Sequence, residues 1–183
     1  MKKSASRNIK ILTTAAMLIA LSATIAAICK IIPLLNLGVG LRITFENLPI
    51  IMAGVMFGPI IGACVGAAAD IVSSLATGQD INFLITLGAL SVGLAAGLSA
   101  KFIVRKKGVL RFAVAEVLAQ VIGSMAVKTI VLYTMFGSIV LFRIPMYVGI
   151  IVVEIVIFAA LYKNRAVRKF IDSYSAEEKH ELQ

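Results

Sequence analysis

The residues of this sequence that could do chemistry are ionisable and amide side chains set inside long apolar segments. Asp70 is one of them, and it closes the stretch LRITFENLPIIMAGVMFGPIIGACVGAAAD over 41–70. Gly62 and Gly66 precede it at intervals of four, so the carboxylate continues a face of small residues on a predicted helix. A carboxylate in an apolar membrane segment is costly, which indicates a partner or a binding role.

A second group of polar residues enters the same stretch at its beginning. Arg42, Glu46 and Asn47 lie there, before the chain turns at 58–59. Polar groups therefore gather at one end of an apolar hairpin. We expect a ligand at that end.

Polar residues recur every fourth position on a later predicted helix. They are Glu116, Gln120, Ser124 and Lys128. This spacing places them along one face, which we expect to point into a helix bundle rather than toward lipid. Two interpretations of Lys128 stay open, because it can neutralise Glu154 or Asp70 and tie helices together, or it can bind a ligand. Arg143, likewise, is either a ligand contact or a side chain reaching for the membrane surface.

The motifs of familiar enzymes are missing from the sequence. The predicted helices contain no histidine, and we find no paired-carboxylate metal motif, no GxSxG and no Walker lysine. Cys29 and Cys64 are separate thiols without metal-ligand spacing. We therefore expect neither enzymatic activity nor a cofactor.

The composition is that of a polytopic membrane protein. Of the 183 residues, 60% are hydrophobic, and the mean hydropathy is +1.00. The net charge of +9 does not indicate nucleic acid, because fourteen of the eighteen basic residues flank apolar segments, in 1–10, 101–111 and 163–179. This distribution predicts both termini in the cytoplasm of a multi-pass protein of the cell membrane.

Hydropathy predicts one all-α transmembrane domain over 1–183 with six membrane-spanning helices. Their predicted ranges are 9–30, 43–57, 60–75, 83–104, 112–136 and 144–163. A charged cytoplasmic tail follows over 164–183, and an ordered outer loop is expected over 30–41.

Small residues form two stripes at which another helix could approach closely. They are Ala16, Ala20, Ala23 and Ala27 on the first predicted helix, and Gly62 and Gly66 on the third. Packing within the chain and packing against a partner both remain open. A channel or a self-sufficient transporter is disfavoured, since the polar residues gather at one end and no internal repeat is visible. A small ligand receptor that needs a partner remains, and its rival is a scaffold protein without a ligand.

Residues 41–74 carry a motif that resembles a known family. Its elements are Arg42, Phe45, Leu48-Pro49, Ala53-Gly54, Phe57-Gly58-Pro59, Gly62, Gly66 and Asp70. They resemble the signature of substrate-binding S components of energy-coupling factor (ECF) vitamin transporters, closest to the folate family. The resemblance implies capture of a vitamin from outside, together with a transmembrane coupling subunit and two ATPases. It also implies that the small-residue stripes face the coupling subunit.

The start of the fourth predicted helix departs from the folate pattern, because Phe83 is its one aromatic residue. Other anionic vitamins such as pantothenate or nicotinate therefore stay open as ligands. Basic residues suit an anionic tail, polar residues can recognise a heterocycle and aromatic residues can stack on it. The predicted substrate-binding residues are Arg42, Phe45, Glu46, Asn47, Asp70, Gln79, Asn82, Phe83, Thr86, Lys128, Arg143 and Tyr147.

Overall fold

The computed structural model describes residues 2–32, 36–38, 41–103 and 108–180, and these residues are almost entirely helical. The elements in chain order are α1 (Lys2–Ile31), β1 (Asn36–Gly38), β2 (Leu41–Arg42), α2 (Asn47–Phe57), α3 (Pro59–Ala76), α4 (Phe83–Phe102), α5 (Val109–Ala119), the π-helix η1 (Gln120–Lys128), α6 (Thr129–Phe136), the 3₁₀-helix η2 (Gly137–Phe142), α7 (Arg143–Lys163) and α8 (Arg165–His180). The two short strands pair antiparallel.

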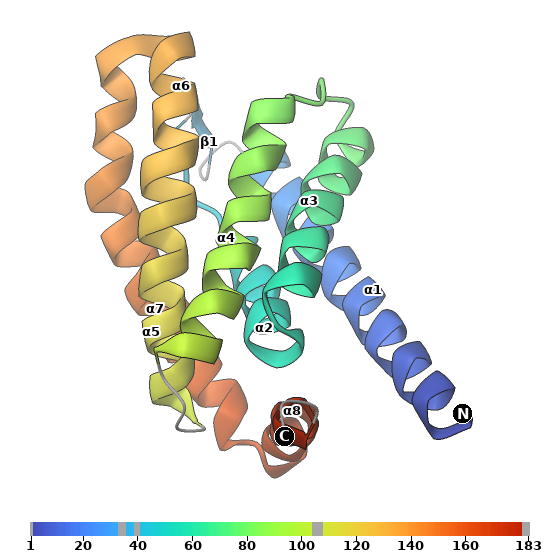
Figure 1. The fold of residues 1–183 in the computed structure, drawn as a ribbon. Coiled ribbons are helices and arrows are strands. Elements are labelled where there is room, and N and C mark those ends of the chain that lie inside the picture. Colours follow the sequence, from blue (N-terminus) through green and yellow to red (C-terminus); the bar gives the residue numbers. More distant parts are fainter. Residues whose placement is uncertain (1, 33–35, 39–40, 104–107, 181–183) are drawn as a thin grey trace.

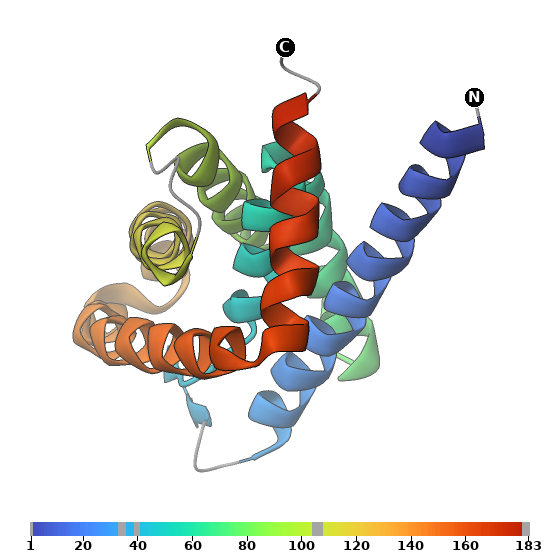
Figure 2. The same cartoon turned by 90° about the horizontal axis from the view of Figure 1, so that it is seen from below.

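The long helices run between two ends of one bundle (Figure 1). We call the end with β1, β2 and the α3–α4 loop the hairpin end, and the end with both chain termini the terminal end. The helices α5, η1 and α6 follow one another as one rod beside α7. The first helix, α1, leans away from the bundle toward its N-terminus, and α8 lies crosswise below α2 (Figure 2).

Five helical stretches of the described chain are long and apolar enough to cross a membrane. They are Arg7–Ile31, Pro59–Ala76, Phe83–Phe102, Val109–Thr134 and Val140–Lys163. These spans fit a multi-pass membrane protein, and they match five of the six predicted helices in place.

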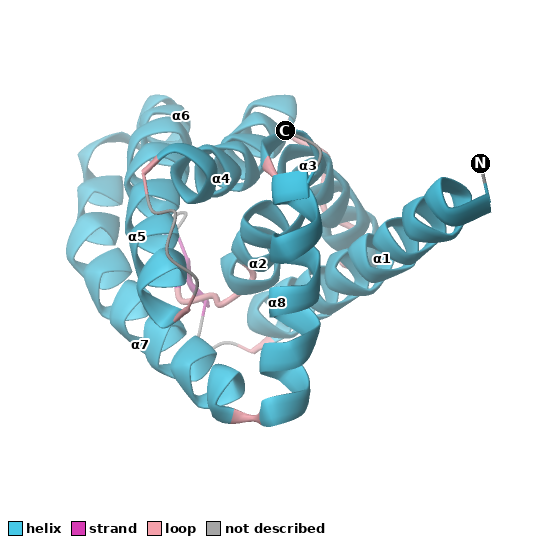
Figure 3. Cartoon of the chain, turned by 60° about the horizontal axis from the view of Figure 1, so that its bottom comes forward, coloured by secondary structure: helices cyan, strands magenta, loops and turns pink. Residues whose placement is uncertain are grey.

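The predicted span over 43–57 is shorter than expected, because α2 begins only at Asn47 and has 11 residues. At about 1.5 Å per residue it is about 16 Å long, against about 30 Å for a bilayer core. The preceding residues are held in a turn, where Ser22 Oγ donates to the Glu46 carbonyl at 2.6 Å and Glu46 N donates to Thr44 Oγ1 at 3.2 Å. The six-span prediction is therefore not confirmed: α2 is a short helix whose residues are mostly buried, and it lies among the other helices of the bundle (Figure 3).

The packing of α3 on α4 depends on glycine at facing positions. A Cβ atom on Gly93 would overlap the Gly62 carbonyl, and one on Gly66 would overlap the Ala89 carbonyl. Both α3 glycines are buried, so their stripe serves packing inside the chain. Of the two interpretations left open by the sequence, this favours packing within the chain for Gly62 and Gly66, because α4 already occupies the face that carries them.

The connection between α2 and α3 has the predicted geometry. Gly58 adopts a φ of 89°, a left-handed value that favours glycine, and Pro59 occupies the first position of α3. The sharp turn brings α3 back alongside α2.

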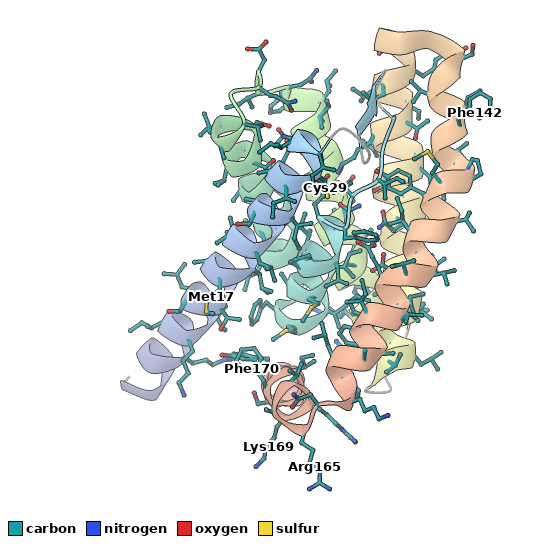
Figure 4. All side chains as sticks on the ribbon, turned by 180° about the vertical axis from the view of Figure 1, so that it is seen from behind. Met17, Cys29, Phe142, Arg165, Lys169 and Phe170 are labelled. Carbon is teal, nitrogen blue, oxygen red and sulfur yellow. The ribbon has the colours of Figure 1, made fainter. Side chains whose placement is uncertain are left out.

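The charged tail predicted over 164–183 contains a helix, α8, in its described part. Four apolar or aromatic side chains recur at spacings of three and four: Val167, Phe170, Ile171 and Tyr174. Ile171 is buried, and the Tyr174 ring meets Phe57 of α2 edge-on at 5.2 Å between centroids. The abundant charges of this segment concealed its apolar face. Arg165 and Lys169 point away from the bundle (Figure 4).

The α3–α4 contact can be tested with one added methyl group. We expect Gly93→Ala to lower stability by about 1–3 kcal/mol, because the methyl group has no space beside the Gly62 carbonyl. Thermal unfolding in detergent micelles measures this. The matched control is Gly149→Ala on α7, where no atom lies within 4 Å of the added Cβ. Equal stability of the two variants would contradict the packing argument.

Candidate functional site

A small polar pocket lies between α1, α2, α3, α4 and η1 in the hairpin half of the bundle. Its lining residues are Ser22, Ala26, Glu46, Ile50, Ala69, Asp70, Ser73, Ala89 and Lys128. The volume open to the centre of a water-sized sphere is about 10 Å³, room for about one water molecule. The pocket is thus closed around its polar groups.

An ion pair forms one wall of this pocket. Lys128 Nζ lies 3.6 Å from Glu46 Oε1, and the two side chains are only 5% and 9% exposed. The turn that holds Glu46 is fixed by Ser22 of α1, as described above. Removing two charges from water is costly, so these groups depend on each other.

The lysine reaches this position because α4 has a glycine beneath it. A Cβ atom on Gly88 would overlap Cγ of Lys128, so the aliphatic stem of the lysine lies directly on the α4 backbone. A side chain at position 88 would therefore crowd the stem of Lys128.

Hydroxyl and carboxylate groups from α3 and α4 form the opposite wall. Thr86 Oγ1 donates to Asp70 Oδ2 at 2.7 Å. Next to it, Lys30 Nζ of α1 donates to Ser73 Oγ at 3.3 Å and lies 3.5 Å from Thr77 Oγ1. The lining of the pocket therefore includes a carboxylate on each of two sides, Glu46 and Asp70, together with the ammonium group of Lys128.

A second polar cluster lies deeper in the bundle and adjoins the pocket through α2. Asn47 Nδ2 donates to Gln120 Oε1 at 2.9 Å and to Ser124 Oγ at 3.1 Å. Gln120 Nε2 in turn donates to Glu116 Oε1 at 3.1 Å and to Glu154 Oε2 at 2.7 Å. All five side chains of this cluster are fully buried.

The π-helix η1 keeps the four-residue stripe on one face. A π-helix has more residues per turn than an α-helix. A step of four residues therefore rotates by slightly less than one full turn in η1 and by slightly more than one full turn in α5. These opposite rotations offset each other, so the side chains from Glu116 to Lys128 stay on one face. The prediction that this stripe faces the interior is confirmed, since each of its members is at most 4% exposed.

The family of the chain follows from its sequence profile. The family model for the substrate-specific component of ECF transporters matches residues 10–171. The chain belongs to the substrate-specific components of ECF transporters. Searches of curated proteins and of solved structures gave no match. Membership of this family makes the chain a transporter subunit rather than an enzyme. Within its described residues, no group of three or more His, Cys, Asp and Glu side chains is placed to hold a metal ion.

The structure of this S component brings five of the predicted substrate-binding residues into the pocket or the adjoining cluster. They are Glu46, Asn47, Asp70, Thr86 and Lys128. Tyr147 is also buried, on α7, and Phe45 is half-buried in the turn before α2. The side chains of Arg42 and Arg143 lie outside the described part of the structure.

Three predicted residues lie away from the pocket at the α3–α4 loop. Phe83 is 75% exposed, so its ring points out of the bundle. Asn82 caps α4, where its Oδ1 accepts from Leu84 N at 3.0 Å. Gln79 is exposed, and its backbone N–H donates to the Ser74 carbonyl at the end of α3.

The partner of Lys128 also differs from the two expected. It pairs with Glu46 instead of Asp70 or Glu154. The reason is the late start of α2, which leaves Glu46 in the turn opposite η1, while Glu154 is bonded to Gln120 at the other end of η1.

Several residues of the site were not predicted. Ser22 and Gly88 carry no charge, and the sequence gives no signal that they position Glu46 and Lys128. Gln120 and Ser124 did give a signal, the four-residue spacing, but it indicated only that they are buried.

We expect the Glu46–Lys128 pair to be revealed by a double-mutant comparison. Lys128→Met removes the ammonium group beside the buried Glu46 carboxylate and should cost about 3–5 kcal/mol. The double variant Lys128→Met/Glu46→Gln should recover most of this loss, because neither charge remains. Thermal unfolding in detergent measures the stability of both variants. If the double variant is no more stable than Lys128→Met, the ion pair is not formed in detergent.

Proposed function

We propose that this S component captures a vitamin that carries a carboxylate, with folate as the first candidate, at the pocket between α1, α2, α3, α4 and η1. The captured vitamin is then carried across the cell membrane by ATP-driven uptake with a coupling subunit and two ATPases. The hairpin end faces outward in this proposal, and both termini lie in the cytoplasm.

The observation that carries the proposal is the buried ammonium group of Lys128 beside Glu46. A ligand carboxylate can take the place of Glu46 as the partner of Lys128, because both are anionic acceptors of the same geometry. Glu46 then holds the lysine in position while no ligand is bound. The pair at 3.6 Å is longer than an optimal charge-assisted hydrogen bond, which leaves the lysine available for a better acceptor.

The opposite wall suits the polar edge of a heterocycle. Asp70 accepts a hydrogen bond from Thr86 at 2.7 Å, and both can turn to a ligand's donor and acceptor groups. Tyr147 and Phe45 are the aromatic side chains that we assign to stacking. Arg42 and Arg143 are further candidates for the anionic tail.

A vitamin can enter only if the walls separate. Ligand pockets of drug size have volumes of about 300–1,000 Å³, far above the present pocket. The contacts that would open are the Glu46–Lys128 pair and the Asp70–Thr86 bond, which link α2 to η1 and α3 to α4. Gln79, Asn82 and Phe83 at the α3–α4 loop would join the site only through such a movement.

Calorimetric titration with folates, pantothenate and nicotinate tests the binding proposal. We expect Glu46→Gln to tighten binding of an anionic vitamin, because it removes the competing carboxylate. The double variant Lys128→Met/Glu46→Gln should weaken binding by about 1.5–3 kcal/mol, since the charge-assisted bond is lost.

The control is Asp80→Asn in the exposed α3–α4 loop, which should leave affinity unchanged. The ligand-receptor proposal fails if no vitamin of the panel binds. If one binds but both variants keep the wild-type affinity, Lys128 is not a ligand contact.

We assign the coupling subunit to an apolar groove between α1 and α3. Its volume is about 430 Å³, and its walls include Leu12, Ala15, Ile61 and Cys64. Ala16 and Ala20 of the α1 stripe are exposed, Ala27 is half-buried and Ala23 is buried. The exposed small residues would allow a partner helix to approach α1 closely. Met17, 68% exposed, points away from the bundle on the same helix (Figure 4).

The two cysteines give a direct test of this groove. Cys64 is exposed in the groove and Cys29 is buried, so a membrane-permeant maleimide should label Cys64 alone in the isolated protein. Assembly with the coupling subunit should protect Cys64 from labelling.

Ala20→Trp should abolish uptake while vitamin binding to the isolated protein persists. Val156→Trp on the exposed face of α7 is the matched control. Labelling of Cys64 that is unaffected by assembly would place the partner elsewhere.

A further inference from the structure

Two glutamates in the interior of the bundle share one hydrogen-bond donor. Gln120 Nε2 donates to Glu116 Oε1 of α5 and to Glu154 Oε2 of α7. Since both oxygens bond to the same nitrogen, they are no farther apart than the two bond distances combined. Glu154 lies near the middle of α7, and both glutamates are 0% exposed.

The cluster around Gln120 lacks hydrogen-bond donors. Each of the three residues bonded to this glutamine keeps one buried oxygen without a partner: Glu116 Oε2, Glu154 Oε1 and Asn47 Oδ1. A buried acceptor without a donor costs about 1–3 kcal/mol, and more when it is charged. Two ionised carboxylates that each keep a buried oxygen without a partner would therefore be strongly unfavourable in the apolar interior.

Among the described residues, basic side chains do not supply the missing hydrogen-bond donors. The other buried titratable groups on the surrounding elements are Glu46, Lys128, Arg111 and Tyr147. Lys128 is paired with Glu46. Among the described residues, no ion pair joins Glu116 or Glu154 to a lysine or arginine, and the α4 residues of the adjoining core are apolar.

Aromatic rings close the cluster on its terminal side. Phe112, one turn before Glu116, stacks on Phe158, one turn after Glu154, with centroids 3.7 Å apart and planes inclined by 5°. Phe158 also stacks on Tyr162 at 5.8 Å. The polar connection runs the other way, through Gln120 and Asn47 toward the pocket.

We propose that Glu116 and Glu154 form a proton-binding site, in which one exchangeable proton is shared between the two carboxyl groups. One carboxyl then donates its O–H to the other, which supplies the missing donor and lowers the charge of the pair from two to one. Two carboxyl groups that share a site hold a proton for this reason. The proton exchanges with water on the pocket side. The site is independent of which vitamin is transported.

The position of Gln120 favours a proton over a metal cation. The –NH₂ group of its amide lies between the two carboxyl groups. A donor at that point repels a cation, which would need oxygen ligands around it.

Infrared spectroscopy of the full-length protein tests the proposal. At neutral pH the wild type should show the C=O band of a protonated carboxylic acid, shifted in D₂O. Glu116→Gln and Glu154→Gln should each abolish the band. In either variant the new glutamine amide donates the hydrogen bond that the carboxylic acid donated before, so the remaining glutamate is ionised. Asp80→Asn in the exposed α3–α4 loop is the control and should keep the band. A wild type without the band, or both pair variants with it, would overturn the proposal.

Stability against pH gives a second readout. At neutral pH the folded pair holds one proton, whereas the two exposed glutamates of the unfolded chain hold none. The free energy of unfolding is therefore larger at lower pH, and it decreases as rising pH removes this proton from the folded protein. We expect the unfolding temperature of the wild type to fall from mildly acidic to mildly alkaline pH, and the curves of the two Glu→Gln variants to be flatter. If either variant fails to fold, the unfolding temperatures of the wild type across the pH series decide. A wild-type unfolding temperature that does not change with pH contradicts a bound proton. Loss of the acid band on replacing choline by Na⁺ would instead identify a metal-cation site and overturn the proton assignment.

Discussion

The architecture depends on the high cost of leaving a charged or polar group unpaired in an apolar bundle. Glu46 and Lys128 form one pair, and Asp70 with Thr86 forms another contact. The first joins the turn before α2 to η1, and the second joins the consecutive helices α3 and α4. Because hydrocarbon offers no substitute partner, these contacts fix how the helices α3 and α4 and the π-helix η1 are placed around the pocket.

The short helix α2 makes this arrangement possible. It ends at the left-handed Gly58 and begins only at Asn47, so its first residues lie inside the bundle rather than at a membrane surface. Glu46 and Asn47 are neighbours in the chain, yet Glu46 contacts the pocket lysine and Asn47 contacts Gln120 of the deep cluster. Any movement of this turn therefore acts on both clusters at once.

The closed pocket and the buried carboxyl pair have a common origin in the rod formed by α5, η1 and α6. The wider turns of η1 present Gln120, Ser124 and Lys128 to the same side as Glu116. π-helical turns occur often at functional sites because they aim side chains that an α-helix would rotate away. The rod thus positions both the lysine that pairs with Glu46 and the buried Glu116 beside Glu154.

Much of this protein follows from the sequence alone. Hydropathy determined the membrane class and five spans, and the four-residue spacing determined the buried face of 116–128, because both depend on local periodicity. The family motif over 41–74 agreed with the family shown by 10–171.

Tertiary structure decided the rest. The chain could not reveal that Lys128 pairs with Glu46, that Phe83 points outward, or that Gly62 packs on α4. Each outcome depends on which surfaces meet in space, and a residue type or spacing fixes the face of a helix but not the neighbour that covers it.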